Sequence, residues 1–350
     1  MNEFIPIYKE AYEEAKILTN SIDNVNVGLL YSKFFDQWVR NDDNNKLEIN
    51  GKAKQSWISK VSNKKIGNGN LIQEMINRRK LMVEAMKMRG YNLIFENTSR
   101  FVTGLGIPHP IENGFAWHHI LGTPYLPGSS VKGIVKSYCI NWLNKPIDDK
   151  DIKRIFGGTD TSNEDGVGSV IFLDAIPYHP VELEGDVITP HYNKYYADAK
   201  KNPPGDWDNP TPIPFLVVKK GQEFMFSIIS RKTGDEDVEK VKEWLIKALD
   251  EMGGGAKTAL GYGRFKQKEE KSQGSNWLER IKMNDKNLDI SESKNIGPIV
   301  KKLLEEGNDI ELKRSVAEEI KNRYPSRWSK PSGKSTIEAI KKLKEILNEQ

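Results

Sequence analysis

An amphipathic helix that runs into a glycine-rich loop most constrains how this chain can fold. Residues 235–252 carry Val238, Val241, Leu245 and Leu249 at helical spacing, and three glycines come directly after them. A helix is expected to end at such glycines. Five of the eleven residues 253–263 are glycine, and a short strand is predicted over 261–265. A helix that returns through a tight loop into a strand predicts an α+β domain, in which helices pack on a sheet.

The middle of the chain supplies the rest of that sheet. Strands are predicted for 91–103, for a short piece near 117–121, for 168–175, and for 215–218 with 224–230. A turn over 124–130 precedes a predicted helix over 131–143. Strand, helix, strands, helix and strand is the order of a ferredoxin-like, RRM-like unit with an antiparallel sheet. We expect two helices on one face of this sheet and a free second face, as in RNA-recognition folds.

Composition divides the chain into three regions. Residues 1–90 are predicted to be mostly helical, from the spacing of Ile7, Tyr12, Ala15 and Leu18 and of the apolar residues in 71–82, with a loop at 41–45. Residues 91–268 form the predicted core, and residues 178–214 form a long insertion in it, expected as a projecting loop or hairpin. Residues 269–350 are predicted to be a helical extension, interrupted at 324–335.

Charge is unevenly distributed along this chain. Residues 271–350 carry 17 Lys/Arg against 13 Asp/Glu, whereas the first 270 residues carry 36 of each. Within that neutral part, residues 51–90 hold ten basic residues and only two acidic ones. Such a segment is the footprint that a polyanion partner uses, and it is equally the pattern of a solvated helical face.

Several functional classes are excluded by composition. A single cysteine, Cys139, excludes an internal disulfide and a cysteine-rich zinc module. No apolar stretch is long enough for a signal peptide or a membrane-spanning helix, so we expect a soluble, cytoplasmic protein with no membrane partner.

The segment Pro127–Gly133, Pro-Gly-Ser-Ser-Val-Lys-Gly, is the first candidate binding motif. Ser129 or Ser130 can cap the helix that comes next, and the helix N-terminus beside Lys132 would then attract an anion. An ordinary turn with a capped helix is the alternative. The spacing does not fit the phosphate loop G-x-x-x-x-G-K-[ST], so nucleotide hydrolysis is not expected.

The loop over 253–265 is the second candidate motif. Its glycines would let the backbone approach a ligand closely, Lys257 and Arg264 would supply charge, and Tyr262 would supply a stacking face. A flexible turn accounts for the first three glycines but not for Gly-Tyr-Gly-Arg at 261–264. A phosphate-rich chain fits both motifs better than a small ligand.

The five histidines form no metal-binding spacing. His118 and His119 are adjacent, so on a strand they would point to opposite faces and could not bind one metal ion together. No cofactor is expected. Either histidine acting alone could serve as a general base on RNA, which leaves a metal-independent endoribonuclease as the alternative function.

Three blocks carry a family resemblance: 104–114 (GLGIPHPIENG), 122–133 (GTPYLPGSSVKG) and 255–265 (GAKTALGYGRF). With the run 189–216 they resemble RAMP superfamily proteins of CRISPR effector complexes, of the sixth-subunit type in the type III-B (Cmr) complex. The match covers roughly residues 90–265 in the correct order. The basic segment 51–90 and the extension 269–350 lie outside it.

The resemblance implies a non-catalytic RNA-binding backbone subunit of an antiviral ribonucleoprotein. Such a subunit would contact the 3′ part of the crRNA and the crRNA–target duplex, beside other Cmr-type RAMP subunits and small helical subunits. The RNA-binding residues carried over by the resemblance are Ser129, Ser130, Lys132, Lys257, Thr258, Tyr262 and Arg264. The insertion 178–214 would project towards a neighbouring subunit or the duplex. A plain protein-interaction scaffold is the remaining alternative.

Overall fold

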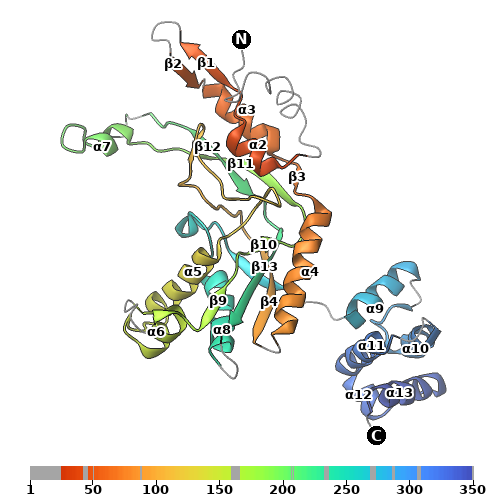
Figure 1. The fold of residues 1–350 in the computed structure, drawn as a ribbon. Helices are drawn as coiled ribbons and strands as arrows, with labels where there is room; N and C mark the ends of the chain where they lie inside the picture. Colours follow the sequence, from red (N-terminus) through yellow and green to blue (C-terminus); the bar gives the residue numbers. More distant parts are fainter. Residues whose placement is uncertain are drawn as a thin grey trace. The chain divides into compact units, whose positions relative to one another are not determined.

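The chain divides into two compact units, residues 1–268 and 269–350 (Figure 1). The computed structural model describes residues 25–41, 46–49, 51–86, 89–158, 166–205, 207, 209–231, 236–268, 273–285, 288–305 and 309–348. The helical spacing of Ile7, Tyr12, Ala15 and Leu18 lies outside these residues, and so does most of the loop predicted at 41–45.

Helices and strands are mixed in the first unit. Its described helices are α2 (Val27–Lys33), α3 (Gly51–Val61), α4 (Gly69–Ala85), α5 (Gly128–Asn141), α6 (Lys150–Phe156), α7 (Asn193–Ala197), α8 (Asp237–Glu251) and the 3-10 turn η3 (Thr258–Leu260). Its strands are β1 (Trp38–Asn41), β2 (Lys46–Ile49), β3 (Lys65–Ile66), β4 (Gly90–Asn97), β5 (Pro108–His109), β6 (Glu112–Asn113), β7 (Trp117–His118), β8 (Thr123–Pro124), β9 (Val170–Phe172), β10 (Ile176–Pro177), β11 (Val181–Ile188), β12 (Ile213–Val218), β13 (Glu223–Ser230) and β14 (Phe265–Lys268).

The main sheet has the order β10–β13–β4–β14, and β9 pairs with the same edge of β13 as β10 does. All its pairings are antiparallel. The register places Phe224 opposite Phe95 and Phe226 opposite Leu93. The predicted class of mixed helices and antiparallel sheet is therefore confirmed.

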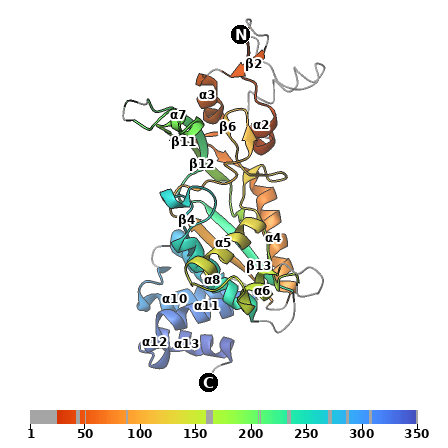
Figure 2. The same cartoon turned by 90° about the vertical axis from the view of Figure 1, so that its left-hand side faces the viewer.

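Both faces of the main sheet are covered. Alternate residues of β4 and β13 join the core that contains the buried faces of α5 and α8, among them Phe95, Phe224 and Phe226. Met225 points the other way and packs with Ile72 and Ile76 of α4. Figure 1 shows α5 and α8 on one side of the sheet and α4 on the other, and in Figure 2 α5 and α8 lie in front of β4 and β13. The expected free face is thus partly covered, because α4 buries its own apolar stripe there.

A second sheet has the order β12–β11–β3. The expectation that residues 215–218 belong to the main sheet is wrong, since β12 pairs with β11 along 213–218. The insertion therefore begins as an antiparallel hairpin whose base is core, with Leu183 and Val218 fully buried. Its outer part carries α7 (Figure 1) and exposes Tyr196 by 71% and Trp207 by 78%.

Several element boundaries differ from prediction, and the strand predicted over 91–103 ends at Asn97 while that over 168–175 is only Val170–Phe172. Helix α5 begins at Gly128 rather than at residue 131. The last strand begins at Phe265, because residues 261–264 form a turn that precedes β14. The helix predicted from the apolar spacing in 71–82 is α4, and the one predicted over 235–252 is α8.

The second unit is helical in its described residues and has its own core. It comprises α9 (Gln273–Asn284), η5 (Ser293–Asn295), α10 (Ile296–Glu305), α11 (Ile310–Arg323), α12 (Pro325–Ser329) and α13 (Lys334–Leu347). Trp277, Ile299, Trp328 and Leu343 are buried together. The interruption predicted at 324–335 contains the short helix α12. In the described parts of the chain, no helix combines the length and apolar character needed to cross a membrane.

Candidate functional site

Three segments far apart in the sequence meet at one groove in the first unit, here called the α5 groove. It has a volume of about 590 Å³. One side comes from α5 and the residues before it, and the others come from the turn 104–107 and the loop after α8. The lining residues are Thr103, Gly104, Leu105, Gly106, Ile107, Ala116, Tyr125, Leu126, Pro127, Ser130, Gly133, Ile134, Ser137, Met252, Gly253, Gly255, Ala256 and Thr258.

Two of the seven predicted RNA-binding residues line this groove. They are Ser130 and Thr258, one from each predicted motif. Ser129 is exposed in the first turn of α5, and Lys132 lies half-buried on a part of the helix that does not line the groove. Lys257, Tyr262 and Arg264 also lie outside the lining, so the groove contains fewer charges than the sequence predicted.

The capping of α5 differs from prediction. Pro127 is the N-cap residue, and neither Ser129 nor Ser130 caps the helix through its side chain. Instead the Gly128 N–H donates to the Asp174 carboxylate, at 2.7 Å. A negative charge from a distant loop therefore already occupies the helix N-terminus, which weakens the anion site that the sequence suggested.

Backbone geometry explains the glycines of the loop 253–263. Gly255 and Gly263 have φ of +88° and +69°, and a Cβ on them would lie 2.1 Å from the Val102 carbonyl oxygen and 1.9 Å from that of Gly254. Hydrogen bonds from Ala256 N–H to Val102 and from Gly263 N–H to Arg100 attach the loop to the segment after β4. A structural turn therefore explains the glycines of Gly-Tyr-Gly-Arg at 261–264 as well as the first three glycines, contrary to our sequence interpretation.

Tyr262 and Lys257 fasten the loop to the second sheet. The Tyr262 hydroxyl donates to the Asp186 carboxylate at 2.6 Å, and its ring packs near Phe215 of β12. The Arg100 guanidinium also binds that carboxylate, at 2.9 Å. The Lys257 ammonium stands 5.6 Å from the centre of the Phe215 ring. These side chains hold the groove wall in place.

Arg264 is occupied at the other end of the loop. Its guanidinium donates to the Glu251 carbonyl oxygen at the C-terminus of α8. A cation at this end of a helix satisfies a free carbonyl and opposes the negative end of the dipole. Its position therefore has a structural explanation.

The histidines are held in structural contacts rather than arranged as a catalytic pair. The His118 Nδ1 accepts a hydrogen bond from the Leu121 N–H at 3.3 Å, and its ring meets Tyr125 edge-on. Burial lowers the pKa of His118, so its imidazole is neutral near pH 7. His119 is exposed. His109 stacks on Tyr31.

Other reactive groups are inert or dispersed. Burial raises the pKa of the Cys139 thiol to about 12, so it is not a nucleophile at neutral pH. The described residues contain no cluster of His, Cys, Asp and Glu side chains that could hold a metal ion.

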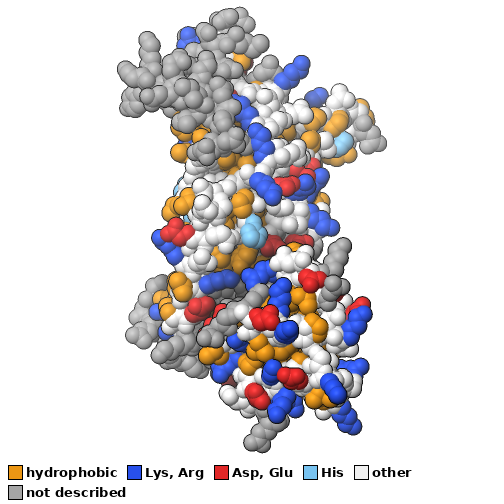
Figure 3. All heavy atoms as spheres, turned by 90° about the vertical axis from the view of Figure 1, so that its right-hand side faces the viewer, with side chains coloured by type: hydrophobic (Ala, Val, Ile, Leu, Met, Phe, Trp, Pro, Cys, Tyr) orange, Lys and Arg blue, Asp and Glu red, His pale blue; other side chains and the backbone are white. Residues whose placement is uncertain are grey.

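The basic segment 51–90 is largely engaged within the protein. Lys60 pairs with Asp36 at 2.5 Å, and Lys54 pairs with Glu112. Arg79 donates to the Asp174 carbonyl oxygen, while Lys80 approaches the Tyr178 hydroxyl. Figure 3 shows Lys and Arg side chains lying beside Asp and Glu side chains on one face of the molecule. The structure therefore favours the solvated helical face over a polyanion footprint.

Sequence reasoning missed two residues of the groove that carry hydroxyl groups, Thr103 and Tyr125. Thr103 and Tyr125 lie in or beside the resemblance blocks, but neither residue carries the charge used as the signal. Asp174 was not among the predicted site residues. Its role at α5 depends on a contact across 46 residues of sequence, which no local pattern encodes.

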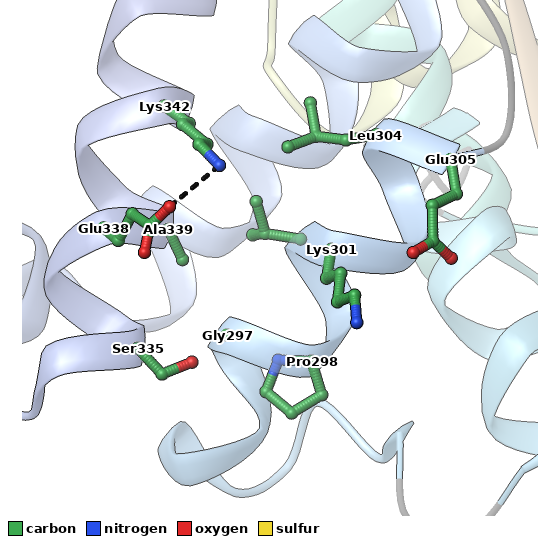
Figure 4. A pocket seen from close by; sticks show the side chains of 10 residues that line it. Gly297, Pro298, Lys301, Leu304, Glu305, Ser335, Glu338, Ala339 and Lys342 are labelled. Carbon is green, nitrogen blue, oxygen red and sulfur yellow. Dashed lines mark ion pairs between the residues drawn. The ribbon is translucent and has the colours of Figure 1, made fainter.

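A second hollow lies in the 269–350 unit between α10 and α13, here called the α10–α13 groove (Figure 4). It has a volume of about 690 Å³. Lys301 and Glu305 line it from α10, and Glu338 and Lys342 line it from α13, where they form an ion pair at 3.0 Å. Its lining is therefore strongly charged.

Known proteins resemble this chain in the region that builds the α5 groove. The RAMP superfamily profile matches residues 94–266, which include all three glycine segments of that groove. The CRISPR system Cmr subunit Cmr6 of Pyrococcus furiosus is 32% identical over 227 residues, covering 49% of this chain and 66% of its own length. The Cmr6 subunit of Saccharolobus solfataricus is 30% identical over 190 residues, covering 52% of this chain and 60% of its own length.

The alignments thus span less than two thirds of either relative. In fold, this chain resembles a chain in the cryo-EM structure of the type III-B Cmr-beta complex bound to cognate target RNA. That likeness has a TM-score of 0.51 at 21% identity, over 74% of this chain and 87% of the other. The family profile and the two relatives together support a Cmr6-type RAMP protein.

Proposed function

We propose that this chain is a non-catalytic, RNA-binding backbone subunit of a type III-B Cmr effector complex. The observation that carries the proposal is the meeting of all three family-resemblance blocks at the α5 groove. The two relatives are named as Cmr6 subunits, and the matched fold comes from a complex bound to target RNA. The expected ligands are the 3′ part of the crRNA and the crRNA–target duplex.

The fold around the groove supports this assignment. The order β10–β13–β4–β14, with α5 and α8 on one face, matches a ferredoxin-like core in which the two helices come after the first and third strands. We propose this core for residues 91–268, with 1–90 and 269–350 as added regions. The exposed hairpin end around Tyr196 and Trp207 would face a neighbouring subunit or the duplex.

The RNA-binding residues divide by position in this proposal. Ser130 and Thr258 would contact RNA inside the groove, with Ser129, Lys132 and Lys257 beside it. Tyr262 and Arg264 would act by holding the loop, since their polar groups bind Asp186 and the Glu251 carbonyl.

Co-purification tests the assembly. The full chain, tagged and co-expressed with candidate Cmr subunits and a guide RNA, should retain a complex that contains a discrete, protected guide. Recovery of the chain alone and free of RNA would contradict the proposal.

The nuclease alternative is tested separately. Pure chain incubated with labelled RNA in EDTA should leave the RNA intact. The position of His118 already argues against it, because its basic nitrogen faces the Leu121 N–H. Cleavage that disappears in His118→Ala or His119→Ala would establish the alternative.

A further inference from the structure

The lining of the α5 groove is uncharged. No Lys, Arg, Asp or Glu occurs among its lining residues within the described parts of the chain. Moving a phosphate from water into a hollow without a cation costs free energy that nothing in this groove would offset. The chemistry of the groove therefore disfavours the charged part of a nucleic acid.

Its polar groups are hydroxyls. Among the described residues, the hydroxyls of Tyr125, Ser130 and Thr258 have no hydrogen-bond partner, whereas Thr103 donates to the Tyr125 carbonyl oxygen. Each hydroxyl can donate and accept, which suits base edges and the ribose 2′-OH. Leu105 and other apolar side chains supply the remaining surface.

The size and the surroundings fit one nucleoside. A volume of about 590 Å³ lies within the roughly 300–1,000 Å³ of pockets that bind small organic molecules. Tyr125 lines the groove and is half-buried, and an aromatic residue at this position suits stacking with a base. Lys132 and Lys257 lie near the groove segments but outside the lining, where phosphates remain solvated.

We propose that the α5 groove binds the ribose and base of one nucleotide of single-stranded RNA, while the flanking phosphates stay outside. This inference rests on the proposed RNA-binding function and specifies which part of the RNA the groove recognises. It replaces the phosphate cradle that the glycine motifs suggested.

Two substitutions from different segments can fill the groove without disturbing the backbone. Gly133 of α5 and Gly106 of the facing turn both line it, and a Cβ on either residue would have no atom within 4 Å. Neither glycine has a positive φ. Gly133→Phe and Gly106→Phe should therefore fold normally, which thermal melting of each variant checks.

The experiment measures binding of the full chain by fluorescence anisotropy. The probes are a labelled oligouridylate and an abasic ribose-phosphate oligomer of the same length and charge. The parent should bind oligouridylate more tightly, and each variant should lose about 5- to 150-fold of that affinity, the range expected for one stacked base. Abasic binding should weaken much less, because only the ribose contacts are lost, and the slope of log affinity against log salt should stay constant because no phosphate contact is lost.

Ile147→Phe is the matched control. Ile147 is 68% exposed and does not line the groove, so this variant should bind like the parent. Equal weakening of both probes by the groove variants would mean that the groove holds the sugar–phosphate chain, and would overturn the inference alone. Equal affinity of the parent for both probes would also overturn this inference while leaving RNA binding itself in place. No parental binding to either probe would overturn RNA binding itself.

Discussion

The α5 groove and the α10–α13 groove have similar volumes, about 590 and 690 Å³, yet opposite linings. The first is lined by glycines, hydroxyls and apolar side chains. The second carries Lys301, Glu305, Glu338 and Lys342. Regional charge would not have revealed this difference, since it counts side chains without regard to where they point.

The two grooves also differ in what builds them. Backbone turns at glycines form much of the α5 groove, so its shape depends on particular φ angles. The α10–α13 groove lies between two amphipathic helices, and its charged side chains are on their outer faces. The first should be sensitive to single glycine changes and the second to the packing of its helices.

Removing a core aromatic residue should change the stability of one unit relative to the other more than any other substitution considered below. Trp328 is 6% exposed within the core of the second unit, and Trp328→Ala should destabilise that unit by about 3–5 kcal/mol. Phe265→Ala is the matched change in the first unit. Hydrogen exchange with mass spectrometry should show lost protection in the mutated unit alone. Loss across both units would mean that they unfold together.

A glycine substitution should affect the α5 groove next most strongly. Gly263→Ala adds a methyl group 1.9 Å from the Gly254 carbonyl oxygen at a φ of +69°, so we expect a loss of about 2–3 kcal/mol. Gly133→Ala, placed in open space on α5, should instead stabilise by about 0.5–1 kcal/mol. Urea unfolding measures both. Equal stability of the two variants would contradict the backbone origin of this groove.

The charge at the N-terminus of α5 gives a smaller effect. Asp174→Ala removes the acceptor of the Gly128 N–H and should cost about 1 kcal/mol. Asp174→Asn keeps an acceptor oxygen and should cost less. Thermal melting compares them, and an alanine variant as stable as the parent would show that water replaces the carboxylate without loss.

The stability of the second unit should depend on pH at acidic values because of Asp289. The Ser291 N–H and the Lys282 ammonium lower the pKa of this carboxyl to about 2. The ionised carboxylate therefore stabilises the folded state fully at pH values above the ordinary pKa of aspartate, and this stabilisation is lost as the pH falls towards 2. The stability difference between parent and Asp289→Asn should therefore shrink from pH 5 to pH 2, as measured by circular dichroism of urea unfolding. A constant difference would contradict this assignment.

Local sequence patterns predicted the elements but not all their partners. The apolar spacing of α8 and its terminal glycines were sufficient to locate that helix, and the resemblance blocks located the groove segments. The run 215–218 reads as a buried strand in either sheet, so its pairing with β11 could not be derived. Ser130 and Thr258, which line the groove, were predicted from the helix-cap pattern and the family resemblance, whereas Tyr125 was not singled out within its block.

The loop after α8 is pinned at both ends by backbone hydrogen bonds, with Gly253–Gly255 on one side and Gly261–Gly263 on the other. The residues between them include Ala259 and Leu260, whose side chains are exposed. Residues that fix the backbone of the loop and residues with exposed side chains therefore lie within a few positions of each other. A designer could randomise 258–260 to retune ligand preference while leaving the fold intact, much as loops are diversified on a rigid antibody framework.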